Sequence, residues 1–302
     1  MFLPGWFNYF LSYYFETRFL GHKKPILAGF KLTHKCNLAC KHCPFWRRQY
    51  PENLKFNQVI DILHRLHQLG VRLIVFEGGE PFIWQDGNWT LADLIPEAKK
   101  LFFSIGITTN GTFPLDVPAH TIWVSFDGLE NTHNYIRGKP VFNEAVRNIK
   151  SSAHPGIYAN ITINRINVKE VPELVKYLNK LVKGITIQFH YPYEEADELM
   201  ASKEDRRIVL DELIDLKREG YSVADSVSAL EALKENTWRC HDWMLADVDP
   251  DGKINLGCYV KNRGKVSCKD CGFAAHTEIS LAYDLNIEAF QAGRRIFRYQ
   301  NG

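Results

Sequence analysis

Short apolar runs rich in β-formers alternate with helix-like segments along most of this chain, and this alternation limits the fold more than any other feature of the sequence. The predicted strands are residues 26–33, 71–77, 103–108, 122–126, 158–163 and 184–189. The predicted helices are residues 57–69, 91–101, 143–151, 171–182 and 203–218. Strands separated by helices form parallel sheets through right-handed crossovers. Six such units predict an α/β fold, a partial (β/α)6 TIM-like barrel that stops short of eight-fold closure.

The composition is that of a folded domain without a need for crosslinks. The chain has 302 residues, of which 45% are hydrophobic and 24% are charged. At this length roughly three quarters of the unfolded surface can be buried, so disulfides are not required. This excludes a disordered chain and a coiled coil. A formal net charge of +2 is too small to indicate nucleic-acid binding, and we expect no nucleic-acid partner.

The cysteines fall into one group of three and one group of four, seven in all. An odd number in tight clusters argues against disulfides and favours metal ligands in a reducing, cytoplasmic compartment. Cys36, Cys40 and Cys43 share one loop after the first predicted strand. Three thiolates can hold three irons of a [4Fe–4S] cluster and leave the fourth iron open. A zinc site with His34 or His42 as the fourth ligand is the alternative.

Polar residues and glycines follow the other predicted strands as well. Residues 78–81 follow the second strand, residues 109–111 the third, and residues 125–128 the fourth, while Asn164 follows the fifth. The carboxyl ends of parallel strands meet at one edge of a sheet, where ligands of such folds bind. Together with three cysteines, these turns predict a binding site at that edge.

The cysteine spacing Cys36-x3-Cys40-x2-Cys43, followed by the Gly-Gly-Glu-Pro turn at residues 78–81, resembles the radical S-adenosylmethionine (SAM) superfamily over residues 26–195. The resemblance implies that the amino and carboxylate groups of SAM bind the open iron of a [4Fe–4S] cluster. An electron from a ferredoxin-type or flavodoxin-type donor then cleaves SAM to a 5′-deoxyadenosyl radical, which attacks a C–H bond or an alkene.

The same resemblance implies which residues contact SAM. His42 matches a position whose ring packs near the adenine, and residues 78–81 match the backbone segment that binds the methionine amino group. Residues 124–138 resemble the fourth-strand segment of SPASM/Twitch-type members, in which Ser125 would contact the ribose or carboxylate and Arg137 would pair with the methionine carboxylate. The alternatives are a surface ion pair for Arg137 and a loop cap for Asn164. The implied cofactor-binding residues are His42, Gly78, Gly79, Glu80, Pro81, Ser125, Arg137 and Asn164.

After about residue 220 the strand–helix alternation gives way to a segment rich in Cys, His, Gly and Asp. Cys240, Cys258, Cys268 and Cys271 offer four thiolates, enough for a cluster with no open iron or for a zinc site with four cysteine ligands. The resemblance to Twitch-type appendages favours one auxiliary [4Fe–4S] cluster. Residues 249–252 predict a hairpin turn between two short strands at residues 245–248 and 253–256. We expect an N-terminal helix (1–24), a radical SAM core (25–220) and a C-terminal auxiliary-cluster domain (221–302).

Residues 2–20 have an aromatic, helical pattern with basic residues after it. The segment is too interrupted to span a bilayer and lacks the features of a signal peptide. It predicts an amphipathic helix, which would lie peripherally on the inner face of the membrane or pack on the protein's own core or at a dimer contact.

Charged residues near the predicted site have two kinds of interpretation. We expect Lys31 and Lys41, near the first cysteines, to be solvated or helix-flanking charges. Glu77 and Asp127 end two of the predicted strands. Their carboxylates would lie near the substrate or cap backbone N–H groups.

The substrate is predicted from weaker signals. Residues 238–273 loosely resemble the C-terminal part of radical SAM enzymes that build hopanoid lipids. With the aromatic first helix, this favours a hydrophobic small molecule or a lipid or isoprenoid substrate, and hence lipid biosynthesis; an apolar barrel mouth would support it. The alternatives are a ribosomal-peptide maturase, a sugar or aminocyclitol dehydrogenase, and a non-catalytic Fe–S or zinc-binding protein, in which residues 78–81 and Arg137 would have no role.

Overall fold

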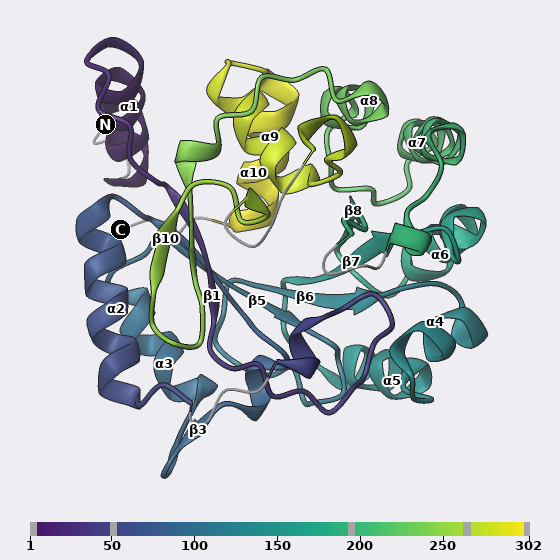
Figure 1. The fold of residues 1–302 in the computed structure, drawn as a ribbon, viewed down its shortest axis with the longest axis horizontal. Helices are drawn as coiled ribbons and strands as arrows, with labels where there is room; N and C mark the ends of the chain where they lie inside the picture. Colours follow the sequence, from purple (N-terminus) through teal and green to yellow (C-terminus); the bar gives the residue numbers. More distant parts are fainter. Residues whose placement is uncertain (1–4, 49–52, 193–196, 262–266, 299–302) are drawn as a thin grey trace.

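The computed structural model describes residues 5–48, 53–192, 197–261 and 267–298. These residues contain an eight-stranded sheet in the order β10-β9-β1-β2-β5-β6-β7-β8. Neighbouring strands from β1 to β8 all run parallel, which confirms the predicted partial barrel (Figure 1). The six strands expected from the sequence are β1 (Leu27–Lys31), β2 (Leu73–Glu77), β5 (Ser104–Thr109), β6 (Thr121–Phe126), β7 (Ile157–Ile163) and β8 (Gly184–Phe189).

Helices cover one face of this sheet because every second strand residue is apolar on that side. Phe30, Phe76 and Ile107 are fully buried there among side chains of the helices, and Val124 and Ile161 continue the same layer. The helices between or after the strands are α2 (Phe56–Leu69), α3 (Leu91–Lys99), α4 (Glu130–Arg137), α5 (Phe142–Ser151), α6 (Val171–Leu178) and α7 (Lys203–Arg218).

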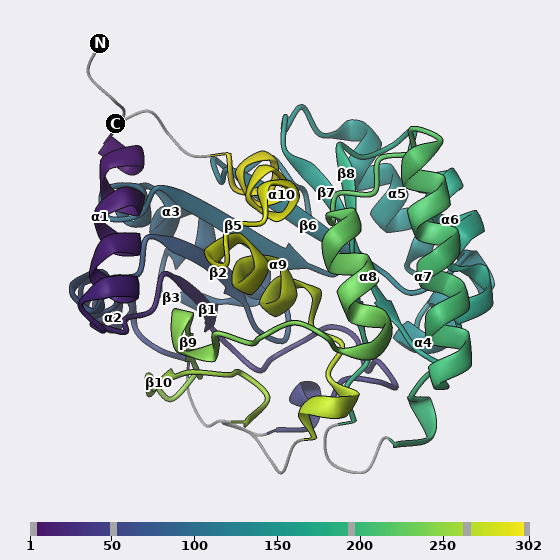
Figure 2. The ribbon, with the colours of Figure 1, turned by 90° about the horizontal axis from the view of Figure 1, so that it is seen from above.

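The C-terminal segment extends the sheet next to the first strand. Strand β9 (Leu245–Val248) pairs in parallel with β1, and β10 (Ile254–Leu256) returns antiparallel to β9. This confirms the predicted hairpin. Helices α8 (Val227–Glu235), α9 (Ala274–Tyr283) and α10 (Ile287–Phe297) were not predicted. In Figures 1 and 2, α9 and α10 lie across the sheet from α3. The domain boundary near residue 220 stays a prediction.

Helix α10 closes the amino end of the face that α2–α7 leave uncovered. Thr121 Oγ1 donates to the carbonyl of Ile296 at 2.5 Å, and Tyr158 Oη donates to that of Arg295 at 3.1 Å. Trp123 and Tyr158 pack against Ile296 in a small apolar cluster. The side chains on the carboxyl half of this face, near the predicted site, are half-buried.

Helix α1 (Gly5–Phe19) packs on the protein's own body through one side, so this predicted alternative is confirmed for that side. Tyr9 Oη donates to the carbonyl of Gly70 at 2.7 Å, and Tyr13 stacks on Trp243 with ring centroids 6.5 Å apart. None of the described helices is long and apolar enough to cross a bilayer. An apolar row, named here the outer stripe, stays exposed on α1: Phe7, Leu11, Phe15 and Phe19.

Candidate cluster and cofactor site

The loop after β1, residues 36–43, is named here the first cysteine loop. Cys40 is buried and Cys36 and Cys43 are half-buried. Burial raises the pKa of all three thiols, that of Cys40 to about 12, and the charges of Cys36 and Cys43 raise the pKa of Cys40 further. The charge of one thiol thus acts on another within this loop, and the binding of a cluster by all three stays a prediction.

The turn after β2 runs against the backbone that leads into this loop. The N–H of Gly79 donates to the carbonyl of Thr33 at 2.7 Å, and the N–H of Glu80 donates to that of Lys35 at 2.9 Å. A Cβ on Gly78 would collide with the carbonyl oxygen of Thr33, and one on Gly79 with that of Lys35. The two glycines are therefore needed to hold the turn against residues 33–35. Their contact with SAM stays a prediction.

Glu80 joins this turn to the end of β5. Its carboxylate accepts from Thr109 Oγ1 and the N–H of Asn110, both at 2.8 Å, and from the N–H of Phe82 at 3.2 Å. Burial raises the pKa of Glu80 to about 7. Pro81, also buried, begins the short 3-10 turn that follows. The side chain of Glu80 thus acts within the protein, and its predicted role at the cofactor stays a prediction.

Asn110 holds the first cysteine loop from the end of β5. Its Nδ2 donates to Asn37 Oδ1 at 2.8 Å, and Asn37 Nδ2 donates to Thr112 Oγ1 at 2.9 Å. Cys36 Sγ lies 4.0 Å from the same Nδ2. The Asn-Gly pair at residues 110–111 marked this strand end in the sequence, but nothing there predicted that it would hold the cysteines.

Arg137 is buried beside the first cysteine loop, so the alternative of a surface ion pair is wrong. Its Nε lies 2.6 Å from Asp127 Oδ2, and its Nη1 lies 3.9 Å from Cys40 Sγ. Burial disfavours the charged forms of Arg137 and Asp127, but the opposite charge of each residue stabilises the charged form of the other. The pKa of Arg137 is therefore raised and that of Asp127 lowered. The predicted pairing of Arg137 with a bound carboxylate stays a prediction, because Asp127 already accompanies it.

His42 also lies near Asp127. Its Nδ1 is 3.9 Å from Asp127 Oδ2 and makes no hydrogen bond to any described residue. Burial lowers the pKa of His42 to about 4. The ring is therefore neutral at neutral pH. A neutral, flat ring with an unsatisfied buried nitrogen suits the predicted contact with an adenine.

Ser125 and Asn164 lie in different settings. Ser125 is half-buried on β6, on the face opposite α2–α7. Asn164 is fully buried and caps its own loop: its Oδ1 accepts from the N–H of Ile166 at 2.9 Å, and its N–H donates to Asn167 Oδ1 at 2.8 Å. The loop cap is thus present, and contact of either residue with SAM stays a prediction.

The remaining cysteines gather near the end of β8. Burial raises the pKa of Cys240 to about 11, with further contributions from Asp242, Cys258 and Cys271. Cys268 likewise raises the pKa of Cys271. The second cysteine group is Cys240, Cys258, Cys268 and Cys271.

This second group is tied to the sheet. The N–H of Phe189 donates to the carbonyl of Gly272 at 2.9 Å, and Arg206 donates to that of Cys271 at 2.6 Å. Four thiols suit an iron–sulfur cluster in their chemistry, and their joint binding of one stays a prediction. Among the described residues, no three His, Cys, Asp or Glu side chains form a group that could hold a single metal ion.

The carboxyl half of the sheet carries polar side chains on the face opposite the apolar layer under α2–α7. Strand register places all of the polar residues named at the end of this paragraph on that face. Thr186 Oγ1 donates to Asn160 Oδ1 at 3.1 Å, and Gln188 Nε2 to Thr162 Oγ1 at 3.3 Å. This is not the apolar mouth that a lipid substrate would favour. The polar face, half-buried throughout, comprises Glu77, Thr108, Ser125, Asn160, Thr162, Thr186 and Gln188.

Lys31 corrects a prediction made from the sequence. Its side chain is only 2% exposed, and its Nζ lies 2.5 Å from Glu77 Oε1. Lys41, in contrast, is exposed as expected. The signal was present in the strand pattern, because Lys31 shares a face with Gly29 and not with Phe30. That face, however, was identified only when the register was known.

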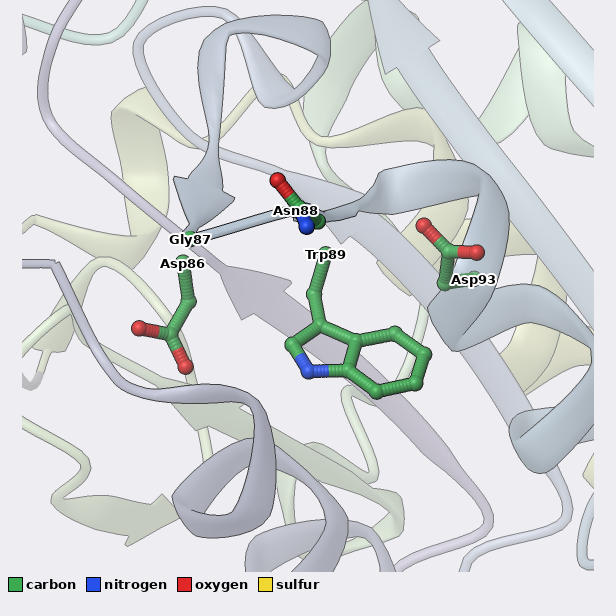
Figure 3. A pocket seen from close by; sticks show the side chains of 5 residues that line it. All are labelled: Asp86, Gly87, Asn88, Trp89 and Asp93. Atoms are coloured by element: carbon green, nitrogen blue, oxygen red, sulfur yellow. The ribbon is translucent and has the colours of Figure 1, made fainter.

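A hollow of about 550 Å³ lies at the hairpin of β3 (Gln85–Asp86) and β4 (Trp89–Thr90) (Figure 3). The Asp86 carboxylate accepts from the N–H of Phe56, and the Asp93 carboxylate accepts from Thr90, so both acids cap local backbone. No cysteine and none of the predicted cofactor residues lines this hollow. It is therefore separate from the candidate site.

A known family model matches the first half of the chain. Residues 30–152 match the family model described as the radical SAM superfamily. The sporulation killing factor maturation protein SkfB of Bacillus subtilis (strain 168) is 31% identical over 164 residues, which are 50% of this chain and 39% of SkfB. The chain thus spans well under half of that relative.

Two further comparisons extend over most of the chain. The mycofactocin maturase MftC of Mycobacterium tuberculosis (strain ATCC 25618 / H37Rv) is 25% identical over 287 residues, 90% of this chain and 70% of MftC. The crystal structure of Streptococcus suis SuiB bound to its precursor peptide SuiA superposes with a TM-score of 0.66 at 14% identity, covering 92% of this chain and 69% of SuiB. At that identity the likeness concerns the fold.

Proposed function

We propose, from the match of residues 30–152 to the radical SAM superfamily model, that the chain is an enzyme that uses SAM at the first cysteine loop. The family uses a [4Fe–4S] cluster together with SAM. Cys36, Cys40 and Cys43 are the proposed ligands of that cluster. The clustered thiols, the glycine turn packed on their loop, and the buried Arg137 beside Cys40 support this assignment.

When bound, the cluster would supply the electron that cleaves SAM to the 5′-deoxyadenosyl radical. The chain's own residues hold and shield that site. Arg137 places a positive charge near Cys40, which offsets the negative charge of a buried thiolate. Asp127 keeps Arg137 charged and fixed, and His42 offers a neutral ring next to them. A low-potential ferredoxin-type or flavodoxin-type protein is the proposed electron donor.

We propose that the substrate is a peptide. The single observation that carries this is the polar face, which lies on the strands that bear the site. An extended peptide presents N–H and C=O groups along its whole length, and hydroxyl and amide side chains can pair with both. The maturation proteins SkfB and MftC, and SuiB with its precursor peptide, support the same substrate class.

A lipid or isoprenoid substrate has no support in the comparisons, and the polar face disfavours it. An apolar chain bound there would leave hydroxyl and amide groups without hydrogen-bond partners, which costs free energy at each group. We therefore replace lipid biosynthesis with peptide maturation as the proposed role.

The second cysteine group is the proposed site of an auxiliary [4Fe–4S] cluster. With four thiols available, no iron would be left open for direct substrate binding. Such a cluster would carry electrons or hold the loop in place.

A membrane contact is proposed for α1 only. The outer stripe is exposed, and exposed Arg18, His22 and Lys23 lie at its end or follow it. Aromatic and apolar side chains flanked by basic ones suit an anionic bilayer surface.

The peptide proposal is tested with anaerobically reconstituted protein, SAM and dithionite. Each reaction adds either a random decapeptide library or farnesol in detergent micelles. We expect the library to raise the yield of 5′-deoxyadenosine several-fold and to give peptide products of altered mass. Farnesol should leave the yield unchanged.

The control is Cys40→Ala, which should abolish 5′-deoxyadenosine formation with either probe. Stimulation by farnesol and none by any peptide would overturn the substrate class while leaving the SAM chemistry intact. Undiminished cleavage in Cys40→Ala would instead overturn the cluster assignment.

A further inference from the structure

Lys31 lies between the two cysteine-bearing segments. Its Nζ is 5.1 Å from the ring centroid of Phe45 and 4.1 Å from that of Tyr259. Phe45 follows Cys43 by two residues, and Tyr259 directly follows Cys258. The two rings are themselves neighbours, with centroids 6.4 Å apart at an angle of 67°.

A buried cation held by a carboxylate makes this contact a fixed one. Glu77 Oε1 lies 2.5 Å from Lys31 Nζ, and both residues sit at paired positions of β1 and β2. Ammonium groups attract the faces of aromatic rings, and the attraction grows when water is excluded. The sheet therefore fixes the position of the ammonium, and the ammonium in turn attracts one ring from each segment.

Other contacts on the C-terminal side continue the connection. Tyr259 packs against Phe273 with centroids 6.0 Å apart, and Phe273 packs against His276 at 5.2 Å. His276 Nδ1 is 4.0 Å from Cys258 Sγ.

We propose that Lys31 is a positioning residue that fixes the loop of Cys258 against the first cysteine loop. Lys31 sets the position of the second cysteine group relative to the first cysteine loop, and it is not itself a ligand. The inference uses the proposed function only in supposing that both segments hold clusters. The contact itself is a property of the chain.

The test is hydrogen exchange of the amides of residues 256–260 in the anaerobically reconstituted protein. Lys31→Met removes the charge and keeps a long side chain. We expect these amides to exchange about tenfold faster in this variant, with iron content unchanged. Lys31→Arg keeps a cation that can stack on both rings and should restore most of the protection.

The matched control is Lys41→Met, which removes an exposed lysine from between Cys40 and Cys43 and should leave exchange unchanged. If Lys31→Met folds poorly, Tyr259→Leu removes the facing ring instead and should give the same local acceleration. Equal exchange of residues 256–260 in all of these variants and the wild type would overturn the proposal. Because the measurement needs neither peptide nor SAM turnover, a failed peptide assay leaves it standing, and the two proposals fail separately.

Discussion

Asp127 is the carboxylate that accompanies Arg137 in the candidate site. It is fully buried, it pairs with Arg137, and it faces His42 and His133. Breaking a buried pair from one side leaves an uncompensated charge, which is more costly than losing an exposed pair. From the sequence, Asp127 was expected to lie near the substrate or to cap backbone. Its pairing with Arg137 follows only from the fold, because α4 brings the arginine back to the end of β6.

We expect Asp127→Asn to lower the free energy of unfolding by about 3 kcal/mol, because Arg137 then stays buried without a counter-charge. Urea unfolding followed by circular dichroism measures this, with samples matched for iron content. Glu97→Gln is the control: it neutralises an exposed acid on α3 and should cost under about 0.5 kcal/mol. Equal midpoints for both variants would contradict the role of Asp127.

A pair of buried acids, Asp225 and Glu278, predicts how stability depends on pH. Burial raises the pKa of Asp225 to about 7 and that of Glu278, beside it, to about 8. The Asp225 carboxylate accepts from the N–H of Ile187, and Glu278 accepts from Ser226. The amine of Lys217 on α7 also faces both acids.

The folded chain therefore keeps these two protons to higher pH than the unfolded chain. Folded protein binds more protons between about pH 4 and 8, so stability falls as pH rises through this window and levels off above it. We expect a loss of several kcal/mol, and a flatter profile for Glu278→Gln, measured by urea unfolding at each pH. Glu212→Gln, exposed on α7, should keep the wild-type slope; a wild-type slope in Glu278→Gln would contradict the assignment.

At the scale of elements, the alternation of strands and helices was readable wherever one face was apolar. Helix α7 and strand β9 have the bounds expected from the sequence. Helices α4, α8, α9 and α10 were missed, and for α4 and α9 the physical reason is clear. Residues 130–137 are mostly polar because α4 serves the site, and α9 buries Thr277, Glu278 and Ser280, which breaks the usual apolar stripe.

Helix α1 gives a prediction at the same scale. Replacing Leu11 and Phe15 by serine removes the middle of the outer stripe without touching the docked side, which uses Tyr9 and Tyr13. We expect the double variant to bind phosphatidylglycerol vesicles several-fold less in a sedimentation assay, because apolar burial at the interface is lost.

The control is Ile208→Ser, which replaces an exposed apolar residue of α7. This variant should bind vesicles as the wild type does. Light scattering accompanies the assay. Conversion of a dimer into a monomer by the α1 substitutions, with vesicle binding unchanged, would identify a second copy as the occupant and contradict the membrane contact.

At the scale of the whole molecule, the first cysteine loop and the second cysteine group are far apart in sequence but share one edge of one sheet. The cysteine spacing made the groups predictable, because metal ligands often follow one another in short local patterns. The contact of Lys31 with Phe45 and Tyr259, one from each cysteine-bearing segment, was not predictable, since it depends on β9 pairing with β1 and on Lys31 pointing away from the helices. Long-range register has no local signature.

Cys268→Ala tests this arrangement. If two [4Fe–4S] clusters are present, anaerobic protein holds about eight irons per chain, and we expect the variant to hold about four. SAM cleavage to 5′-deoxyadenosine should persist in it, without peptide modification, because the first cysteine loop is intact. Unchanged iron in Cys268→Ala would show that the second cysteine group holds something else.

The pairing of β9 with β1 also bears on how the chain is made. During synthesis from the amino end, β1 can pair with β2 early, but its other edge stays open until residues 245–248 leave the ribosome. An unpaired edge of a hydrophobic strand invites pairing with other nascent chains. Fragments cut near residue 220 would keep that edge permanently bare, so expression of the barrel alone calls for a chaperone or a capping strand supplied in trans.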